Sequence, residues 1–127
     1  MVSFEDFCAQ DGVPLYLQIL QYIKRRAASG LIRDREELPS RRVLSATLCV
    51  NPNTVQRAYC QLEEEGLIVS HPGAKSLMCL PAQRVEALQK ELLVADARRT
   101  VAAWRQMGVS YEQAQQLLRQ AWEEENT

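Results

Sequence analysis

The amino-acid sequence predicts a mainly α-helical protein with one small β-hairpin. Apolar residues recur at spacings of three and four in several separate segments, which is the pattern of helices that bury one face. Serine, asparagine or proline begins these segments, and glycine ends several of them, as expected of helix caps. Two short β-like runs, residues 67–70 and 76–80, flank a Pro-Gly pair, and this arrangement indicates a hairpin.

The chain of 127 residues suits one compact domain with an appendage. We expect an N-terminal arm over residues 1–13, a main domain over 14–80 and a two-helix region over 81–127. Hydrophobic residues make up 46% of the chain, which argues against disorder. No segment is apolar and long enough to span a membrane, and the acidic start lacks the basic region of an export signal. A cytoplasmic location is therefore expected.

The first helix is expected over residues 14–30, followed by a surface loop and a short strand over 31–38. The basic run Lys24-Arg25-Arg26 comes late in this helix, where positive charge complements the helix dipole. We interpret these three side chains as a solvated cluster rather than a ligand contact. The apolar face of the helix consists of Tyr16, Ile19, Leu20, Ile23 and Ala27.

A second, short helix is predicted over residues 40–48, beginning at the N-cap Ser40. Only two residues separate its end from Asn51, which caps a third helix over residues 51–66. Two short helices joined by so tight a turn predict a helix-turn-helix. The apolar stripe of the second helix consists of Val43, Leu44 and Leu48.

The third helix is expected to bury one face and to expose a polar one. Val55, Tyr59 and Leu62 share the buried face, while Pro52 suits the first helical position and Gly66 the left-handed stop. Amide, hydroxyl and guanidinium groups near a helix start suit base edges and phosphates. The alternative is an ordinary amphipathic helix with a solvated face. The polar residues in question are Asn53, Thr54, Gln56 and Arg57.

The hairpin that follows a helix-turn-helix is a wing, and Lys75 near its tip could contact phosphate or enter a minor groove. Residues 14–80 thus resemble the winged helix-turn-helix of GntR-family bacterial transcription regulators, in particular the YtrA-type subfamily. The segments that carry the resemblance are Pro14-Leu15-Tyr16-Leu17-Gln18-Ile19, Leu38-Pro39-Ser40-Arg41-Arg42, Asn53-Thr54-Val55-Gln56-Arg57-Ala58-Tyr59 and Leu62-Glu63-Glu64-Glu65-Gly66-Leu67-Ile68.

The resemblance implies a set of residues near DNA. The residues of this chain that match the family's positions near DNA are Ser40, Arg42, Asn51, Asn53, Thr54, Gln56, Arg57 and the wing glycine Gly73. Arg41 stands where many relatives carry an acidic or small residue, so it adds a cation close to the expected DNA surface. The wing lacks the second glycine and the threonine that are common in the family, so the resemblance implies the contacts of the helices more strongly than those of the wing.

The distribution of charge agrees with this interpretation. The net charge of the chain is −1, but residues 14–80 hold nine Lys and Arg against six Asp and Glu. The excess of positive charge is mild, so we expect salt-sensitive DNA binding that also depends on geometry. Glu63-Glu64-Glu65 is interpreted as a solvated helix end that lies away from DNA.

The C-terminal region is predicted to form a helical hairpin that dimerises. One helix should run over residues 81–107 and stop at Gly108, and the next should begin at a capping box of Ser110 and Gln113. Their apolar surface is too wide for a free-standing pair, so a second subunit is expected to cover it. The alternative is packing on the chain's own main domain. The residues expected in the dimer are Leu88, Leu92, Val101, Trp104, Leu117, Leu118 and Trp122.

Other classes of site have little support in the sequence. The four cysteines have no close metal spacing, and the chain has one histidine, His71, so we expect structural cysteines rather than a metal or redox sensor. No phosphate-cradling loop or nucleophile–base pair indicates an enzyme, and no cofactor is expected. A small-molecule effector could bind between subunits, lined by Trp104, Tyr111 and Trp122, although core roles are favoured. Residues 1–13, with Phe4 and Phe7, could be a flexible arm or pack on the dimer.

These observations favour a dimeric, sequence-specific DNA-binding regulator. A repressor acting on a palindromic operator is the leading hypothesis, and the resemblance implies control of a transporter operon. The alternative is a winged-helix protein-interaction module without specific DNA binding, which would more often expose aromatic residues or Met where this chain has polar groups.

Overall fold

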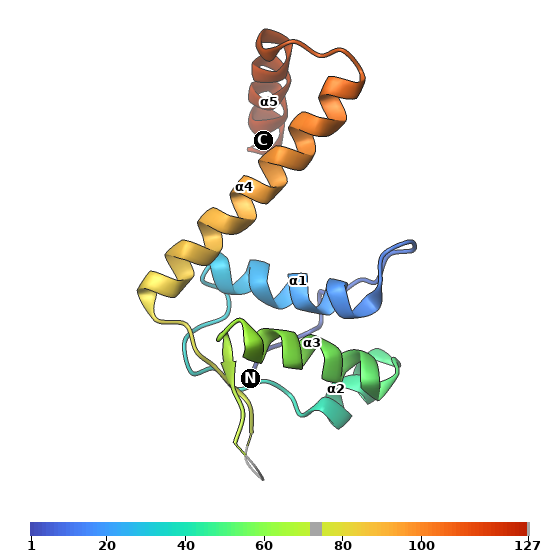
Figure 1. Cartoon of the computed structure of the whole chain (residues 1–127), viewed down its shortest axis with the longest axis vertical. Helices are drawn as coiled ribbons and strands as arrows, with labels where there is room; N and C mark the ends of the chain where they lie inside the picture. The colour runs from blue at the N-terminus through green and yellow to red at the C-terminus, as the bar shows by residue number, and fades with distance from the viewer. Residues whose placement is uncertain (72–74, 127) are drawn as a thin grey trace. The chain divides into compact units, whose positions relative to one another are not determined.

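The computed structural model describes residues 1–71 and 75–126, and these form a mainly helical fold with a two-stranded antiparallel sheet (Figure 1), as predicted. Two compact units are present, Met1–Lys90 and a second that begins at Glu91. No helix in the described part of the chain combines the length and apolarity needed to cross a membrane. In chain order the elements are α1 (Leu15–Ala28), α2 (Arg41–Leu48), α3 (Pro52–Glu64), β1 (Ile68–Val69), β2 (Leu77–Met78), α4 (Ala82–Gln106) and α5 (Tyr111–Glu125).

The predicted helix caps are present. The Ser40 hydroxyl accepts a hydrogen bond from the Val43 amide, and the Asn51 side chain accepts one from the Asn53 amide at 2.8 Å. Ser110 and Gln113 form the expected capping box. Cys49, at φ 55°, ends α2 in the left-handed conformation that usually favours glycine. This turn lets α3 begin three residues later, at Pro52.

Helix α3 is the centre of the first unit and packs against α1 and α2 (Figure 1). The Tyr59 hydroxyl donates a 2.7 Å hydrogen bond to the carbonyl oxygen of Pro39, just before α2. Burial raises the pKa of the Tyr59 phenol, while the nearby Arg41 guanidinium lowers it by less. The fully enclosed core side chains include Ile19, Ile23, Leu38, Leu44, Val55, Ala58, Tyr59 and Leu62.

The apolar stripe predicted for α2 is partly wrong. Val43 is 52% exposed, whereas Leu44 and Ser45 are buried. Leu44 and the half-buried Leu48 lie one turn apart and define the inward side, so Val43 turns toward solvent.

The first residues of the chain are part of the first unit and not a separate arm. Val2 and Phe4 are buried, and the Val2 amide donates to the Glu37 carbonyl at 2.8 Å. The Phe4 ring stacks on Tyr22 of α1 at 5.0 Å, and the Tyr22 hydroxyl donates to the Ser3 carbonyl. This segment therefore packs on α1, which the sequence pattern left open.

We interpreted two charged clusters as solvated, Lys24-Arg25-Arg26 and Glu63-Glu64-Glu65. Both contain residues that form ion pairs in the structure. Lys24 of α1 is buried, and its Nζ lies 2.6 Å from the Glu65 carboxylate at the end of α3. Arg26 lies 3.8 Å from Asp6 and 5.0 Å above the Tyr22 ring. The interpretation was wrong for these residues because α3 brings Glu65 to Lys24, and the N-terminal segment brings Asp6 to Arg26.

The hairpin lies at the C-terminal end of α3 (Figure 1). Ile68 pairs with Met78 and Val69 with Leu77 in antiparallel register. Glu37 adds an isolated bridge to Leu77, which agrees with the short strand expected before α2. Gly73 of the predicted wing lies outside the described residues.

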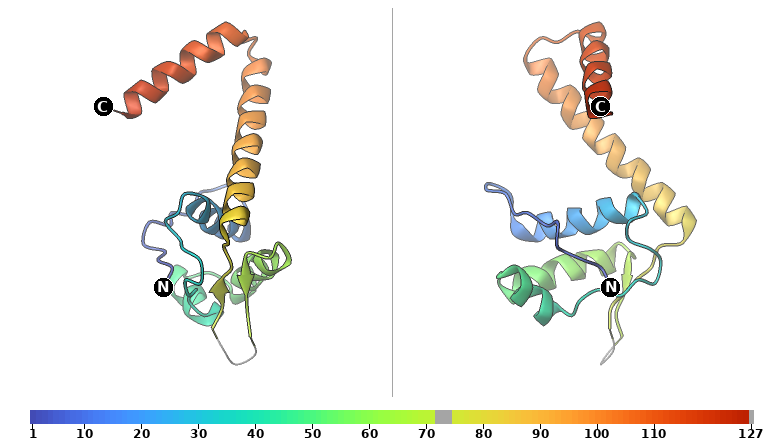
Figure 2. Two further views of the ribbon diagram at one scale, coloured as in Figure 1. Left: turned by 90° about the vertical axis from the view of Figure 1, so that its left-hand side faces the viewer. Right: turned by 180° about the vertical axis from the view of Figure 1, so that it is seen from behind.

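In the second unit, α5 diverges from the C-terminal half of α4 after the turn at Gly108 (Figure 2). No residue of α5 is buried. The two helices follow each other as the predicted hairpin does, but most apolar residues of α5 and of the C-terminal half of α4 are exposed.

Replacing Tyr59 by Phe should lower the free energy of unfolding by about 1–3 kcal/mol, because the buried Pro39 carbonyl loses its donor. Urea unfolding followed by circular dichroism at a fixed protein concentration measures the change. Tyr111→Phe is the matched control, since Tyr111 is 71% exposed. Equal stability of the two variants would contradict this role for Tyr59.

Candidate nucleic-acid interface

The first turns of α3 present a polar surface because the opposite face is fixed in the core. Val55, Ala58 and Tyr59 have no exposed surface, so the opposite side of the helix points outward. Asn53, Gln56 and Arg57 are exposed, and Thr54 is half-buried. Amide and guanidinium donors on one exposed helix face match the hydrogen-bonding groups of base edges in a major groove.

Asn51 and Ser40 have cap roles that restrict what else they can do. Each side-chain oxygen accepts a backbone amide of its own helix, and both residues are exposed. The Asn51 amide nitrogen and the Ser40 hydroxyl hydrogen remain as donors. These residues can therefore contact phosphate while they cap.

Arg57 projects from α3 over an aromatic ring of another helix. Its guanidinium carbon lies 3.7 Å from the centre of the Tyr16 ring in α1. Tyr16 is half-buried, so it contributes an aromatic surface at the border of the core. The sequence pattern placed Tyr16 on the apolar face of α1 and gave no sign of this contact.

The adjacent arginines of α2 have different surroundings. An Arg41 nitrogen lies 2.9 Å from a Glu63 carboxylate oxygen, and its guanidinium carbon lies 5.2 Å from the centre of the Tyr59 ring. Arg42 is exposed, and within the described residues no carboxylate pairs with it. The prediction treated both as cations at the DNA surface, and Glu63 as solvated. The ion pair of Arg41 with Glu63 joins α2 to α3, and the DNA contact expected of Arg41 remains a prediction.

The wing contributes one described cation. Lys75 has 74% of its side chain exposed, and its Nζ lies 3.0 Å from the Glu37 carboxylate. An exposed pair of this kind is weak and easily exchanged for another anion. Lys75 can therefore turn to a phosphate.

The residues predicted for dimerisation divide into two groups. Leu88 and Leu92 are only 4% and 8% exposed in the single chain, so they have little surface left for a partner. They are core residues in the single chain, and their expected role in a dimer remains a prediction. The exposed fractions of the others run from 47% to 75% for Val101, Leu117, Leu118 and Trp122, and Trp104 is half-buried.

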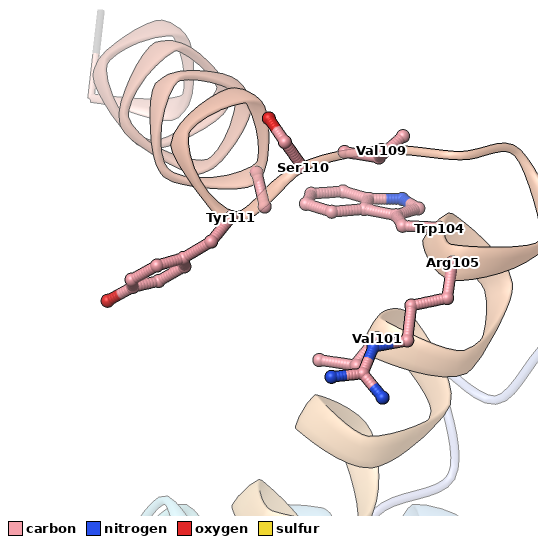
Figure 3. Close-up of a pocket in the computed structure, with 7 residues that line it drawn as sticks. Val101, Trp104, Arg105, Val109, Ser110 and Tyr111 are labelled. Carbon is pink, nitrogen blue, oxygen red and sulfur yellow. The ribbon is translucent and has the colours of Figure 1, made fainter.

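A hollow of about 220 Å³ lies between the end of α4 and the start of α5. The Trp104 indole lies beneath the turn at Val109, whereas the Tyr111 phenol points outward (Figure 3). The hollow is small and largely apolar, with Arg105 and Ser110 as its polar groups.

The structure gives no support to other chemistries within its described residues. No cluster of three or more His, Cys, Asp or Glu side chains there could hold a metal ion. Cys8 and Cys49 are exposed and Cys60 and Cys79 half-buried, and all of these thiols are free.

The fold and this surface define the winged helix-turn-helix class. Residues 15–76 match the model of bacterial regulatory proteins of the gntR family, so the chain carries a helix-turn-helix domain of the GntR family. The transcriptional repressor YtrA of Bacillus subtilis is 41% identical over 59 residues, which cover 46% of this chain and 45% of YtrA. The chain thus spans under half the length of that relative.

Two further relatives cover most of the chain. YhcF of Bacillus subtilis, an uncharacterised HTH-type transcriptional regulator, is 29% identical over 82% of this chain and 86% of its own length. A GntR-family transcriptional regulator from Listeria monocytogenes has a similar structure, with a TM-score of 0.80 and 28% identity. That similarity covers 88% of this chain and 98% of the Listeria chain, so it extends beyond the helix-turn-helix domain.

The neighbouring arginines Arg41 and Arg42 provide a matched pair of substitutions. Arg42→Ala should weaken binding to all duplex DNA alike and lower the salt slope by about one per domain, because an exposed, unpaired cation is lost. Arg41→Ala should instead lower the free energy of unfolding by roughly 1 kcal/mol, because its contacts are internal. Salt-dependent DNA titrations and urea unfolding measure the two effects. A larger loss of DNA affinity for Arg41→Ala than for Arg42→Ala would contradict this assignment.

Proposed function

We propose that this chain is a sequence-specific DNA-binding transcription regulator whose recognition helix is α3. The observation that carries the proposal is the division of α3 between a fully buried face and an exposed polar face at its N-terminal turns. Asn53, Gln56 and Arg57 share that exposed face, and no carboxylate among the described residues pairs with Arg57.

The side chains suit different parts of a DNA duplex. Gln56 can read adenine through its amide, and Arg57 can donate two hydrogen bonds to guanine. Arg42, Ser40 and Asn51 lie at the starts of α2 and α3 and are suited to phosphates, which fix register without reading sequence. Thr54 and Lys75 complete the proposed contact set, and Gly73 belongs to it by the family resemblance. Arg41 acts mainly by holding α2 on α3.

We further propose that the protein acts as a dimer on a palindromic operator. Leu117, Leu118 and Trp122 make a broad apolar surface on α5, a helix without any buried residue. Exposed apolar patches of this kind usually mark a protein interface. A two-fold dimer presents two recognition helices to half-sites about one DNA turn, roughly 34 Å, apart or a multiple of it.

Repression is proposed from the similarity to YtrA, which is named as a transcriptional repressor. Control of a transporter operon rests on the YtrA-type resemblance alone. A bound dimer would act in the cytoplasm by obstructing RNA polymerase at the promoter. The hollow beside Trp104 is the best candidate for an effector site, although its small volume suits a partner side chain equally well.

In vitro selection from a pool of random DNA duplexes tests the proposed function. A regulator of this kind should enrich duplexes with two inverted half-sites, and the purified chain should bind them more tightly than scrambled duplexes of equal length. Failure to enrich any sequence at low salt would favour the protein-interaction module instead.

The variants Gln56→Ala and Arg57→Ala should each reduce affinity for the enriched duplex by about 1–3 kcal/mol, because each removes a base-reading donor. Affinity for scrambled duplex should fall much less. Arg33→Ala is the charge-matched control, since Arg33 is exposed and lies outside α2, α3 and the wing. If Arg57→Ala lowers the affinity of the protein for the enriched and the scrambled duplex equally, Arg57 contacts phosphate and does not read bases.

Trp122→Glu should convert the dimer to a monomer, because a carboxylate cannot be buried in an apolar interface without a partner. Analytical ultracentrifugation measures the mass, and circular dichroism verifies that helix content is unchanged. Gln116→Glu adds the same charge to the exposed α5 at a polar position and should leave the dimer intact. A dimer that survives Trp122→Glu would place the interface away from this end of α5.

A further inference from the structure

The contact between Tyr16 and Arg57 joins the first turn of α1 to the second turn of α3. Both helices are fixed by the core around Ile19 and Val55, which have no exposed surface. The Tyr16 ring therefore has a defined place beside the exposed end of α3. At 3.7 Å from the ring centre, the guanidinium carbon is at van der Waals distance. This distance allows the guanidinium to stack flat on the ring, as arginine side chains do on aromatic faces.

This geometry leaves Arg57 ready to donate hydrogen bonds. The N–H groups of a guanidinium lie in its own plane, so a group stacked flat on a ring points them sideways, toward solvent. The attraction to the ring restrains the side chain without neutralising its charge. The N–H donors and the positive charge of Arg57 therefore remain available to a ligand, whereas an ion pair with a carboxylate would engage them.

Arg41, the other arginine that lies over an aromatic ring at this surface, differs from Arg57 because it also forms an ion pair. Arg41 lies over Tyr59 and also pairs with Glu63 at 2.9 Å. Within the described residues, no carboxylate pairs with Arg57, and its guanidinium contacts the Tyr16 ring instead. One arginine is therefore committed to the fold, whereas the other is oriented and unpaired.

We propose that Tyr16 is a positioning residue that orients Arg57 for DNA. The proposal rests on the proposed function of α3 and adds a residue outside the helix-turn-helix to its specificity. An arginine side chain loses rotamer entropy when it binds, and a side chain already held in place loses less. Tyr16 raises operator affinity in this way without touching DNA itself.

Four variants test the proposal against the duplex enriched by selection. Tyr16→Leu should weaken binding by about two- to fivefold, the range expected for an exposed cation–π contact. Tyr16→Phe keeps the ring and should bind as the wild type does. In the Arg57→Ala background, Tyr16→Leu should cause no further loss, because the group that it positions is gone. Tyr22→Leu is the control for stability, since Tyr22 also lies in α1 under an arginine, Arg26, that is not at the proposed interface.

A second readout needs no DNA. In the NMR spectrum of the free protein, the side-chain protons of Arg57 should be shifted upfield by the ring current of Tyr16. The shift should persist in Tyr16→Phe and vanish in Tyr16→Leu. Absence of the shift in the wild type, or an equal loss of affinity from Tyr16→Leu with and without Arg57, would overturn the proposal. Failure to enrich any duplex would count against the proposed function, while the proton shifts still decide whether Tyr16 holds Arg57.

Discussion

The burial of one face of α3 is the constraint on which the rest of the first unit, Met1–Lys90, depends. Val55, Ala58, Tyr59 and Leu62 are enclosed by α1 and α2, and the Tyr59 hydroxyl is bonded to the Pro39 carbonyl. A helix fixed in this way cannot rotate about its axis without exposing apolar area. Its opposite face is therefore held outward, and the residue types on that face decide what the unit can bind.

Electrostatic pairing then sorts the cations of the unit. Lys24 is buried with Glu65, and Arg41 is paired with Glu63, so the acidic end of α3 serves to hold α1 and α2. Removing either acid would leave a cation without its partner, which is most costly at the buried lysine. Arg42 remains unpaired among the described residues, and Arg57 rests on an aromatic ring. Both of these cations remain available to an anionic partner, and they lie near the starts of α2 and α3.

Local patterns predicted much of this fold, and long-range contacts explain what they missed. Capping residues such as Ser40 and Asn51, and the spacing of Val55, Tyr59 and Leu62, depend on neighbours within one helix, so their roles could be predicted. The ion pair of Lys24 and the ring under Arg57 join residues that are distant in sequence and depend on the tertiary packing. The packing of residues 1–13 could not be predicted for the same reason, because the Phe4 ring stacks on Tyr22 only in the folded chain.

Isotope-edited NMR mapping with an enriched duplex tests most directly whether α3 reads DNA. The account predicts that amide and side-chain signals of residues 51–57 change most on binding, and that a scrambled duplex leaves the side-chain signals of Gln56 and Arg57 nearly unchanged. Changes centred on α5, with residues 51–57 unaffected, would contradict it, because the exposed face of α3 would then not be the surface that reads DNA.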